Sequence, residues 1–271
     1  MVATSGPSRI VASRDSTPIA VFSDGSGPPV VLVHGATADH TTFRVVGPML
    51  AASYTVHAID RRGRGVSGDT APYAIEREFE DVAAVADALA RDSGTAVTVV
   101  GHSYGGRCAL GAALLTSSIG RVVSYEGAPT PSGTSYHPPG IEDRLRALLA
   151  AGDRDAALAT FLSEVVGMPP ADLDAYRADP IWAVRAAAAS TILRELEAET
   201  DPAASLERLG AVRQPVLQIL GGDSLRVFTD ATAALDARLF DGRVAVIEGA
   251  RHAAHHTHPE AFVGLIRGFV D

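Results

Sequence analysis

The stretch that decides the fold reads Val99-Val100-Gly101-His102-Ser103-Tyr104-Gly105-Gly106. A buried strand ends here, a Gly-x-Ser-x-Gly turn follows, and a predicted helix begins at Tyr104. The two outer glycines of the turn leave space for strand and helix to approach closely, so that the Ser103 hydroxyl projects above the end of the strand. The helix directs its positive end toward that hydroxyl. The pattern indicates a nucleophile at Ser103; the alternative is a glycine-rich connecting loop with an ordinary serine.

Alternating strands and helices surround this turn. Short apolar stretches predict strands at 30–33, 54–59, 96–100, 121–125, 215–220 and 243–247. Helical spacing of apolar residues predicts helices at 76–91, 104–116, 230–239 and 259–270. This alternation predicts an α/β fold with a mostly parallel central sheet and helices on both faces.

One long segment interrupts the alternation. From about Gly140 to Leu209 the sequence is alanine-rich and helical, without a convincing strand. We expect a core domain made of residues 1–132 and 210–271, and an inserted helical cap over residues 133–209. Such a cap would cover the carboxyl ends of the strands, where Ser103 lies.

Four motifs in the expected order make the chain resemble the α/β-hydrolase superfamily from about Ile19 to Phe269. They are the Ser103 turn, Val31–Gly35, Asp60–Gly68 and Gly249–His252. The resemblance implies the α/β-hydrolase fold and an oxyanion hole formed by the backbone N–H groups of Ala36 and Tyr104. It also implies a catalytic histidine after the last strand.

The predicted base is His252, because it follows that strand after a short glycine-containing loop and lies C-terminal to the serine. It would accept the Ser103 proton and return it to the leaving group. The rivals are His255, His256 and His258, which lie in a run that resembles the start of a helix.

The acid of the triad has two candidates. The usual family position lies after the strand 215–220, but counting from Gly221 puts Ser224 at the familiar spacing and Asp223 one residue short. Glu126 lies at the carboxyl end of the strand 121–125, where zearalenone lactonases and one haloalkane dehalogenase subgroup keep their acid. A buried carboxylate at the tip of an internal strand is costly without a partner such as a histidine N–H. This argument favours Glu126.

Two residues are candidates for substrate contact. The only tryptophan, Trp182, lies in a Pro-x-Trp segment of the cap that resembles the segment zearalenone lactonases use against their macrolactone. Its alternative role is to anchor the packing of the cap. His34 could also contact the substrate, although a histidine at this position more often shapes the loop.

Composition excludes several other classes of function. The 271 residues carry a net charge of −9, with no basic run longer than two residues, which argues against nucleic acid or an anionic membrane as partner. No apolar stretch approaches the roughly 18–20 residues of a membrane helix, and no secretory signal is visible, so we expect a cytoplasmic protein. The single cysteine excludes an internal disulfide, and no motif suggests a metal or an organic cofactor.

The sequence therefore predicts a serine hydrolase that cleaves a mostly apolar, uncharged small-molecule ester or lactone through an acyl-enzyme. A serine cannot replace the carboxylate nucleophile of dehalogenases and epoxide hydrolases of this fold. Two alternatives stay open: a carbon–carbon bond hydrolase or lyase with the same triad, and a non-catalytic ligand-binding protein. The sequence leaves the oligomeric state undetermined.

Overall fold

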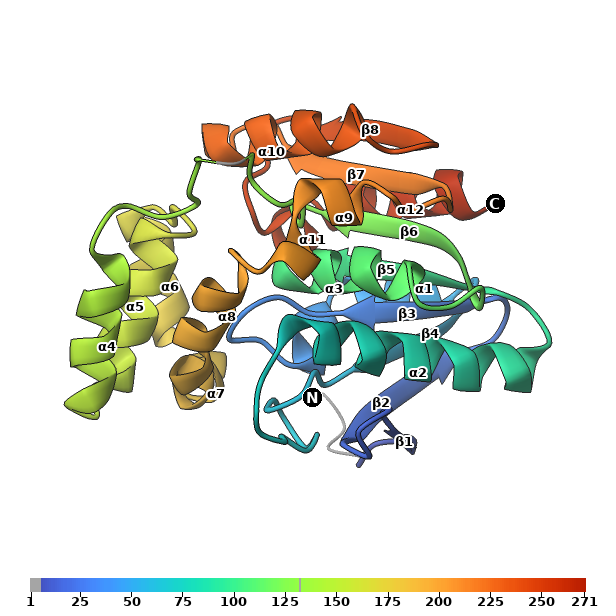
Figure 1. Ribbon diagram of the computed structural model, residues 1–271, viewed down its shortest axis with the longest axis horizontal. Coiled ribbons are helices and arrows are strands. Elements are labelled where there is room, and N and C mark those ends of the chain that lie inside the picture. The colour runs from blue at the N-terminus through green and yellow to red at the C-terminus, as the bar shows by residue number, and fades with distance from the viewer. Residues whose placement is uncertain (1–5, 132) are drawn as a thin grey trace.

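A computed structural model describes residues 6–131 and 133–271, and within these residues eight strands form one twisted sheet (Figure 1). The spatial order is β1-β2-β4-β3-β5-β6-β7-β8. The strands are β1 (Arg9–Ala12), β2 (Pro18–Gly25), β3 (Pro29–Val33), β4 (Thr55–Ile59), β5 (Val97–His102), β6 (Ile119–Tyr125), β7 (Val216–Gly221) and β8 (Gly242–Ile247). All six predicted strands are present, and they pair in parallel from β4 to β8.

The first two strands were not predicted from the sequence. β1 and β2 form an antiparallel pair, and β2 continues antiparallel along β4. They extend the sheet at the edge farthest from β8 (Figure 1).

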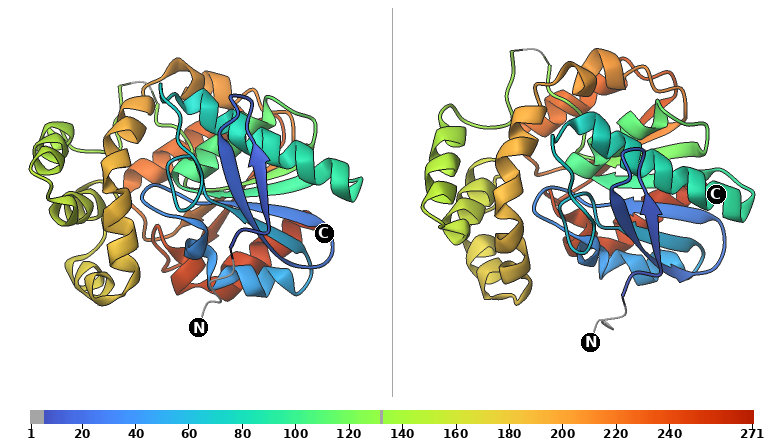
Figure 2. Two further views of the ribbon diagram at one scale, coloured as in Figure 1. Left: turned by 90° about the horizontal axis from the view of Figure 1, so that it is seen from below. Right: turned by 60° about the horizontal axis from the view of Figure 1, so that its bottom comes forward.

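Helices cover both faces of the sheet, as the alternation predicted (Figure 2). One face packs mainly against α2 (Ile75–Ser93), α3 (Tyr104–Ala113) and α10 (Arg226–Asp236). The other face packs against α1 (Val46–Ala51) and α12 (Pro259–Val270). Shorter helical turns are η1 (His40–Phe43) and α11 (Ala254–Thr257). The central strand β3 is buried along its whole length, as expected for a parallel strand covered on both sides.

A helical insert lies between β6 and β7, at the end of the sheet toward which both strands point (Figure 1). Its helices are α4 (Ile141–Ala150), α5 (Arg154–Glu164), α6 (Pro170–Ala178), α7 (Ile181–Ala187), η2 (Ala188–Thr191) and α8 (Ile192–Ala198). These helices share a hydrophobic cluster of their own, which runs from Ile141 to Leu196. By contrast, η3 (Pro202–Ala204) and α9 (Leu206–Leu209), which the sequence analysis assigned to the cap, pack into the core cluster under the sheet.

Buried charges join the insert to the core. Glu195 of α8 is 2% exposed and lies 2.5 Å from Arg61 and 2.6 Å from Arg64. Arg61 also binds Glu78 of α2 at 2.6 Å. Because each charge is out of water, its cost is offset only while its partners stay in place. The position of α8 is therefore fixed relative to the core.

We expect Glu195→Ala to lower the free energy of unfolding by about 3–5 kcal/mol, because it leaves two buried guanidinium groups without their shared partner. The matched control is Glu197→Ala on the same helix, whose ion pair with Arg146 is exposed. That variant should stay within about 0.5 kcal/mol of the parent protein. Urea denaturation at neutral pH measures both values, and equal effects of the two substitutions would contradict a special role of Glu195.

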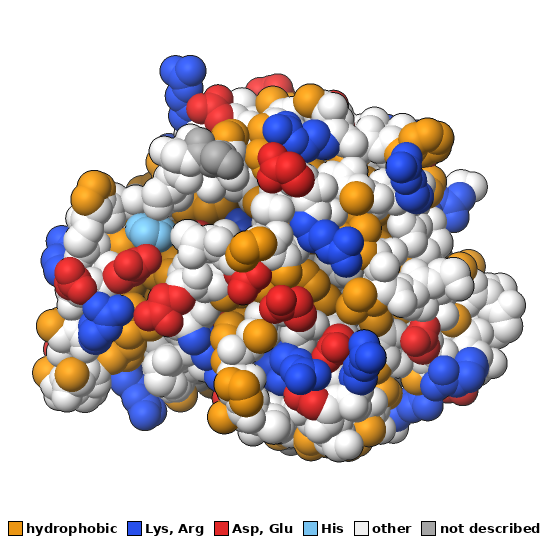
Figure 3. Space-filling model, viewed as in Figure 1, with side chains coloured by type: hydrophobic (Ala, Val, Ile, Leu, Met, Phe, Trp, Pro, Cys, Tyr) orange, Lys and Arg blue, Asp and Glu red, His pale blue; other side chains and the backbone are white. Residues whose placement is uncertain are grey.

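On the face drawn in Figure 3, acidic and basic side chains are interspersed over the core and the insert. Within the described part of the chain, no helix has the length and apolar character needed to cross a membrane.

Candidate active site

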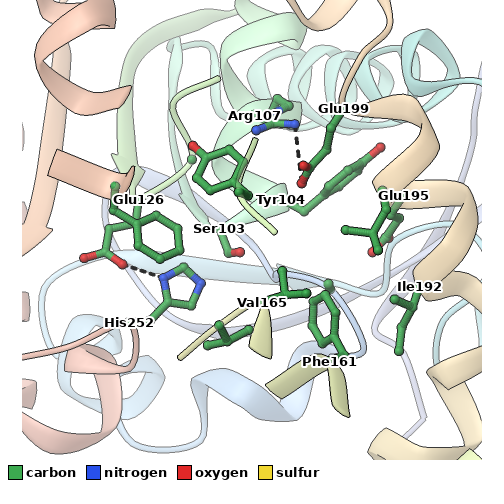
Figure 4. Close-up of a pocket in the computed structure, with 16 residues that line it drawn as sticks. Ser103, Tyr104, Arg107, Glu126, Phe161, Val165, Ile192, Glu195, Glu199 and His252 are labelled. Carbon is green, nitrogen blue, oxygen red and sulfur yellow. Dashed lines mark hydrogen bonds and ion pairs between the residues drawn. The ribbon is translucent and has the colours of Figure 1, made fainter. Parts of the chain in front are cut away.

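Ser103 lies on a strained turn between β5 and α3. Its backbone has φ 54° and ψ −125°, in the left-handed half of conformational space that a residue with a side chain rarely adopts. Glycine is required at positions 101 and 105 because backbone atoms of neighbouring segments approach these two residues closely. A Cβ at Gly101 would lie 2.3 Å from the carbonyl oxygen of Gly105, and one at Gly105 would lie 2.3 Å from that of Val33. The turn therefore presents the Ser103 side chain to a pocket above the sheet (Figure 4).

Two backbone N–H groups lie next to this serine in the same pocket. Tyr104 is the first residue of α3, and Ala36 follows the end of β3; both line the pocket together with Ser103. Within residues 6–131 and 133–271, neither N–H donates a hydrogen bond to another protein group. Both positions agree with the predicted donors to an oxyanion.

His252 and Glu126 form a hydrogen-bonded pair beside Ser103. The Nδ1 atom of His252 lies 2.5 Å from Oε2 of Glu126, whose side chain is fully buried. This leaves Nε2 of His252 as the ring nitrogen available to Ser103. No hydrogen bond joins Ser103 to His252 within the described residues, and such contacts are often long in unliganded enzymes. Figure 4 shows the pair on one side of the pocket.

Glu126 is held by the loop that carries the acid in the usual family arrangement. Its Oε1 atom accepts hydrogen bonds from the N–H of Gly221 at 2.8 Å and from the hydroxyl of Ser224 at 2.5 Å. Glu126 itself has φ 48°, so the backbone turns sharply after β6 to bring the carboxylate to this loop. Asp223, the rival acid, is exposed, and the histidine bonds to Glu126 instead.

The loop that carries His252 is fixed from below by two aromatic side chains. The Tyr125 hydroxyl donates to the carbonyl of Arg251 and accepts from the N–H of Ala254. His102 bonds through Nε2 to the carbonyl of His252 at 2.8 Å. Burial holds the pKa of His102 well below its ordinary value, so this ring is neutral and serves as a structural donor.

The other histidines near His252 differ from it in their surroundings. Burial holds the pKa of His255 well below its ordinary value and lowers that of His256 to about 4. Neither of them is hydrogen-bonded to a carboxylate within the described residues, and neither lines the pocket with Ser103.

His34 does not occupy the position expected of a substrate contact. It is completely buried, and its Nδ1 bonds to the carbonyl of Gly35 at 2.9 Å while Nε2 accepts from the N–H of Arg61 at 3.0 Å. Burial also lowers its pKa, so the ring is neutral. Both nitrogens are used to shape the loop after β3, which is the alternative role that the sequence analysis gave for this histidine.

Trp182 also lies away from the pocket, inside the insert. Its indole N–H donates to Asp155 of α5, and its ring stands edge-on to Tyr176 of α6 at 5.8 Å. Only 8% of the residue is exposed. Trp182 therefore joins α5, α6 and α7 as a packing anchor, the alternative role given in the sequence analysis, and it is not among the residues that line the pocket.

The pocket between the sheet and the insert has walls of two kinds. Apolar side chains from the insert and from α10 form most of the lining: Phe161, Val165, Val166, Ile192, Leu196 and Phe228. The end away from Glu126 carries Arg107, Glu195 and Glu199 (Figure 4). The sequence analysis did not assign the three charged residues, although Arg107 lies one helical turn after Ser103 and therefore faces the same way.

Within the residues that the structure describes, no group of three or more histidine, cysteine or acidic side chains is arranged to hold a metal ion.

Comparison with known proteins places the whole chain among hydrolases. The profile of the alpha/beta hydrolase family matches residues 30–265. A solved alpha/beta hydrolase from Sphaerobacter thermophilus is 34% identical and superposes with a TM-score of 0.82, covering 97% of this chain and all of that one.

Two curated relatives have named activities. Pimeloyl-[acyl-carrier protein] methyl ester esterase of Neisseria meningitidis is 30% identical over 255 residues, which are 89% of this chain and 76% of the relative. 2-(Acetamidomethylene)succinate hydrolase of Mesorhizobium japonicum is 29% identical over 267 residues, which are 93% of this chain and 91% of the relative.

Proposed function

Because the chain belongs to the alpha/beta hydrolase family, we propose that it is a serine hydrolase that cleaves a small carboxylic ester or lactone. One observation carries this proposal: a strained serine, a histidine bonded to a buried carboxylate, and two free backbone N–H groups all face one pocket. A relative named for the hydrolysis of a methyl ester supports an ester as the substrate class.

The proposed reaction assigns one step to each group. Nε2 of His252 accepts the Ser103 proton while Oγ attacks the carbonyl carbon of the substrate. The N–H groups of Ala36 and Tyr104 stabilise the oxyanion, and the N-terminus of α3 adds its positive dipole. His252 then protonates the leaving alkoxide. Water, activated by the same histidine, releases the acid from Ser103.

Glu126 orients His252 in this scheme. A carboxylate bonded to Nδ1 keeps the proton on that nitrogen and stabilises the ring when it becomes positively charged. The donors from Gly221 and Ser224 hold the carboxylate in place. The Phe228 ring stacks on His252 at 4.6 Å between centroids and covers it from solvent.

Labelling with a fluorophosphonate tests the proposal, with intact mass as the readout. We expect a single adduct that maps to Ser103. The labelled chain should lose all activity toward a panel of short-chain methyl esters and lactones. The proposal is overturned if the treated protein is folded but carries no adduct, and if it shows no activity on this panel.

Two other outcomes identify the alternatives that the sequence leaves open. Cleavage of a β-diketone with no turnover of esters would favour a carbon–carbon bond hydrolase. Saturable binding of an ester without turnover would favour a ligand-binding protein.

A further inference from the structure

Arg107 is a buried cation in the wall of the pocket. It is 3% exposed, and its Nε and Nη1 atoms are buried without a partner among the described residues. A guanidinium carries five N–H donors and stays charged at all relevant pH values. Leaving such donors unpaired out of water is costly, because the lost hydration is not replaced.

The groups around Arg107 hold its side chain in place, but among the described residues none accepts a hydrogen bond from its Nε or Nη1 atom. Its guanidinium carbon lies 5.5 Å from the ring centroid of Tyr136 and 5.9 Å from that of Tyr104. The nearest carboxylate is Glu199, whose Oε1 lies 3.6 Å from Nη1, beyond hydrogen-bond distance. Glu199 follows α8 and its side chain is 20% exposed, so it lies at the solvent side of the guanidinium.

The position of Arg107 relative to Ser103 indicates which part of a substrate would supply a hydrogen-bond acceptor. Arg107 follows Ser103 by four residues on the same helix face, which corresponds to about 6 Å along the helix axis. Figure 4 shows Glu126 at the left of the pocket, Arg107 and Glu199 at its top, and Phe161, Val165 and Ile192 along the side that faces them. A substrate that spans the pocket would have an apolar middle and a polar end.

We propose that Arg107 forms a carboxylate-binding subsite, so that the substrate is the half-ester of a dicarboxylic acid with a short apolar chain. This inference rests on the proposed ester hydrolysis at Ser103 and specifies the acyl group. The free carboxylate accepts hydrogen bonds from the guanidinium, which favours planar carboxylates, while the ester carbonyl lies at Ser103.

Glu199 limits how strongly an anion binds there. Its charge opposes that of an incoming carboxylate, and burial raises its pKa, which lowers the cost of neutralising it when an anion enters. The charges of the neighbouring cluster cancel, because Arg61 and Arg64 are balanced by Glu78 and Glu195. Arg107, whose ion pair with Glu199 spans 3.6 Å, is therefore the more loosely paired cation at this end.

The test compares monomethyl esters of succinate, glutarate, adipate and pimelate with methyl esters of the straight-chain acids of equal carbon number. We expect kcat/KM to favour the half-ester at one or two chain lengths. For the best half-ester, Arg107→Gln should lower kcat/KM by about 100-fold, because charged hydrogen bonds to the substrate are lost. For the uncharged ester, the same substitution should change kcat/KM by less than about threefold. Arg107→Lys should keep part of the preference.

Two control variants separate this role from a general effect of charge. Arg226→Gln removes an exposed arginine of α10 and should leave the preference unchanged. Glu199→Gln removes the opposing carboxylate and should lower KM for the half-esters. The inference is overturned if the parent protein prefers the uncharged ester at every chain length, or if Arg107→Gln lowers kcat/KM equally for the half-ester and the uncharged ester.

A binding measurement keeps this inference separate from the proposed function, because it needs no turnover. Calorimetric titration of the parent protein with the four dicarboxylates should give saturable binding that Arg107→Gln abolishes, with the neutral diamide of glutarate as the uncharged control. Absence of binding by all four overturns the subsite. Absence of a Ser103 adduct, by contrast, overturns the proposed hydrolysis.

Discussion

Replacing Ser103 with alanine is expected to lower kcat/KM for any ester substrate by at least about 10⁴-fold, because the oxyanion donors and the binding pocket supply only the residual rate. The substitution removes one oxygen and keeps the Cβ atom, so the turn between β5 and α3 should persist. Steady-state kinetics measures the loss, and thermal unfolding checks the fold. The variant should also lose all labelling by a fluorophosphonate.

A matched control is Ser163→Ala on α5. Its hydroxyl bonds only to the carbonyl of Thr160 in its own helix, and the residue does not line the pocket. This variant should keep the activity of the parent protein. If Ser103→Ala retained more than a few per cent of the activity while folded, Ser103 would not be the nucleophile.

Glu126→Gln should reduce kcat/KM by about 10³–10⁴-fold, close to the effect of the same change in well-studied triads. The amide can present an N–H to His252 instead of an acceptor, which favours the wrong tautomer of the ring. Asp223→Asn is the control, since this side chain is exposed and makes no bond to His252 among the described residues. It should change the rate by less than about threefold, as expected for an exposed side chain outside the triad.

The order of these two effects decides the identity of the acid. Both variants are isosteric, so the comparison does not depend on a change of volume, and circular dichroism with thermal unfolding checks that each is folded. A larger loss for Asp223→Asn than for Glu126→Gln would move the acid to the loop after β7.

The parallel part of the fold could be predicted because its strands are short continuous apolar stretches. β3, β5 and β7 are buried on both faces. Such strands are recognised by a continuous apolar stretch, without alternation of apolar and polar residues. β1 and β2 lie at the sheet edge, where exposed residues interrupt the buried ones. Their pairing depends on a long-range contact with β4, and sequence periodicity does not contain that contact.

At the site, the sequence could predict the residues whose positions follow from the order of strands. Ser103 and His252 each follow a recognisable strand, and Glu126 could be favoured over Asp223 by the cost of burying a charge at a strand end. For His34 and Trp182 the sequence left two roles open, because the choice depends on which polar atoms the tertiary fold brings to each ring nitrogen. Arg107 was missed for a related reason: an arginine in a helix is ordinary until its lack of partners is visible.

The two walls of the pocket differ in how freely they can change during evolution. Ile192 and Leu196 line one wall, and between them α8 carries Glu195, whose ion pairs stabilise the whole molecule. Phe161 and Val165 line the other wall from α5 and the residue after it, and α5 packs against neighbouring helices of the insert. Substitutions along α5 therefore affect the packing within the insert, whereas substitutions along α8 also affect the ion pairs that join the insert to the core. Directed evolution of substrate range in this enzyme should accumulate its tolerated changes on the α5 side.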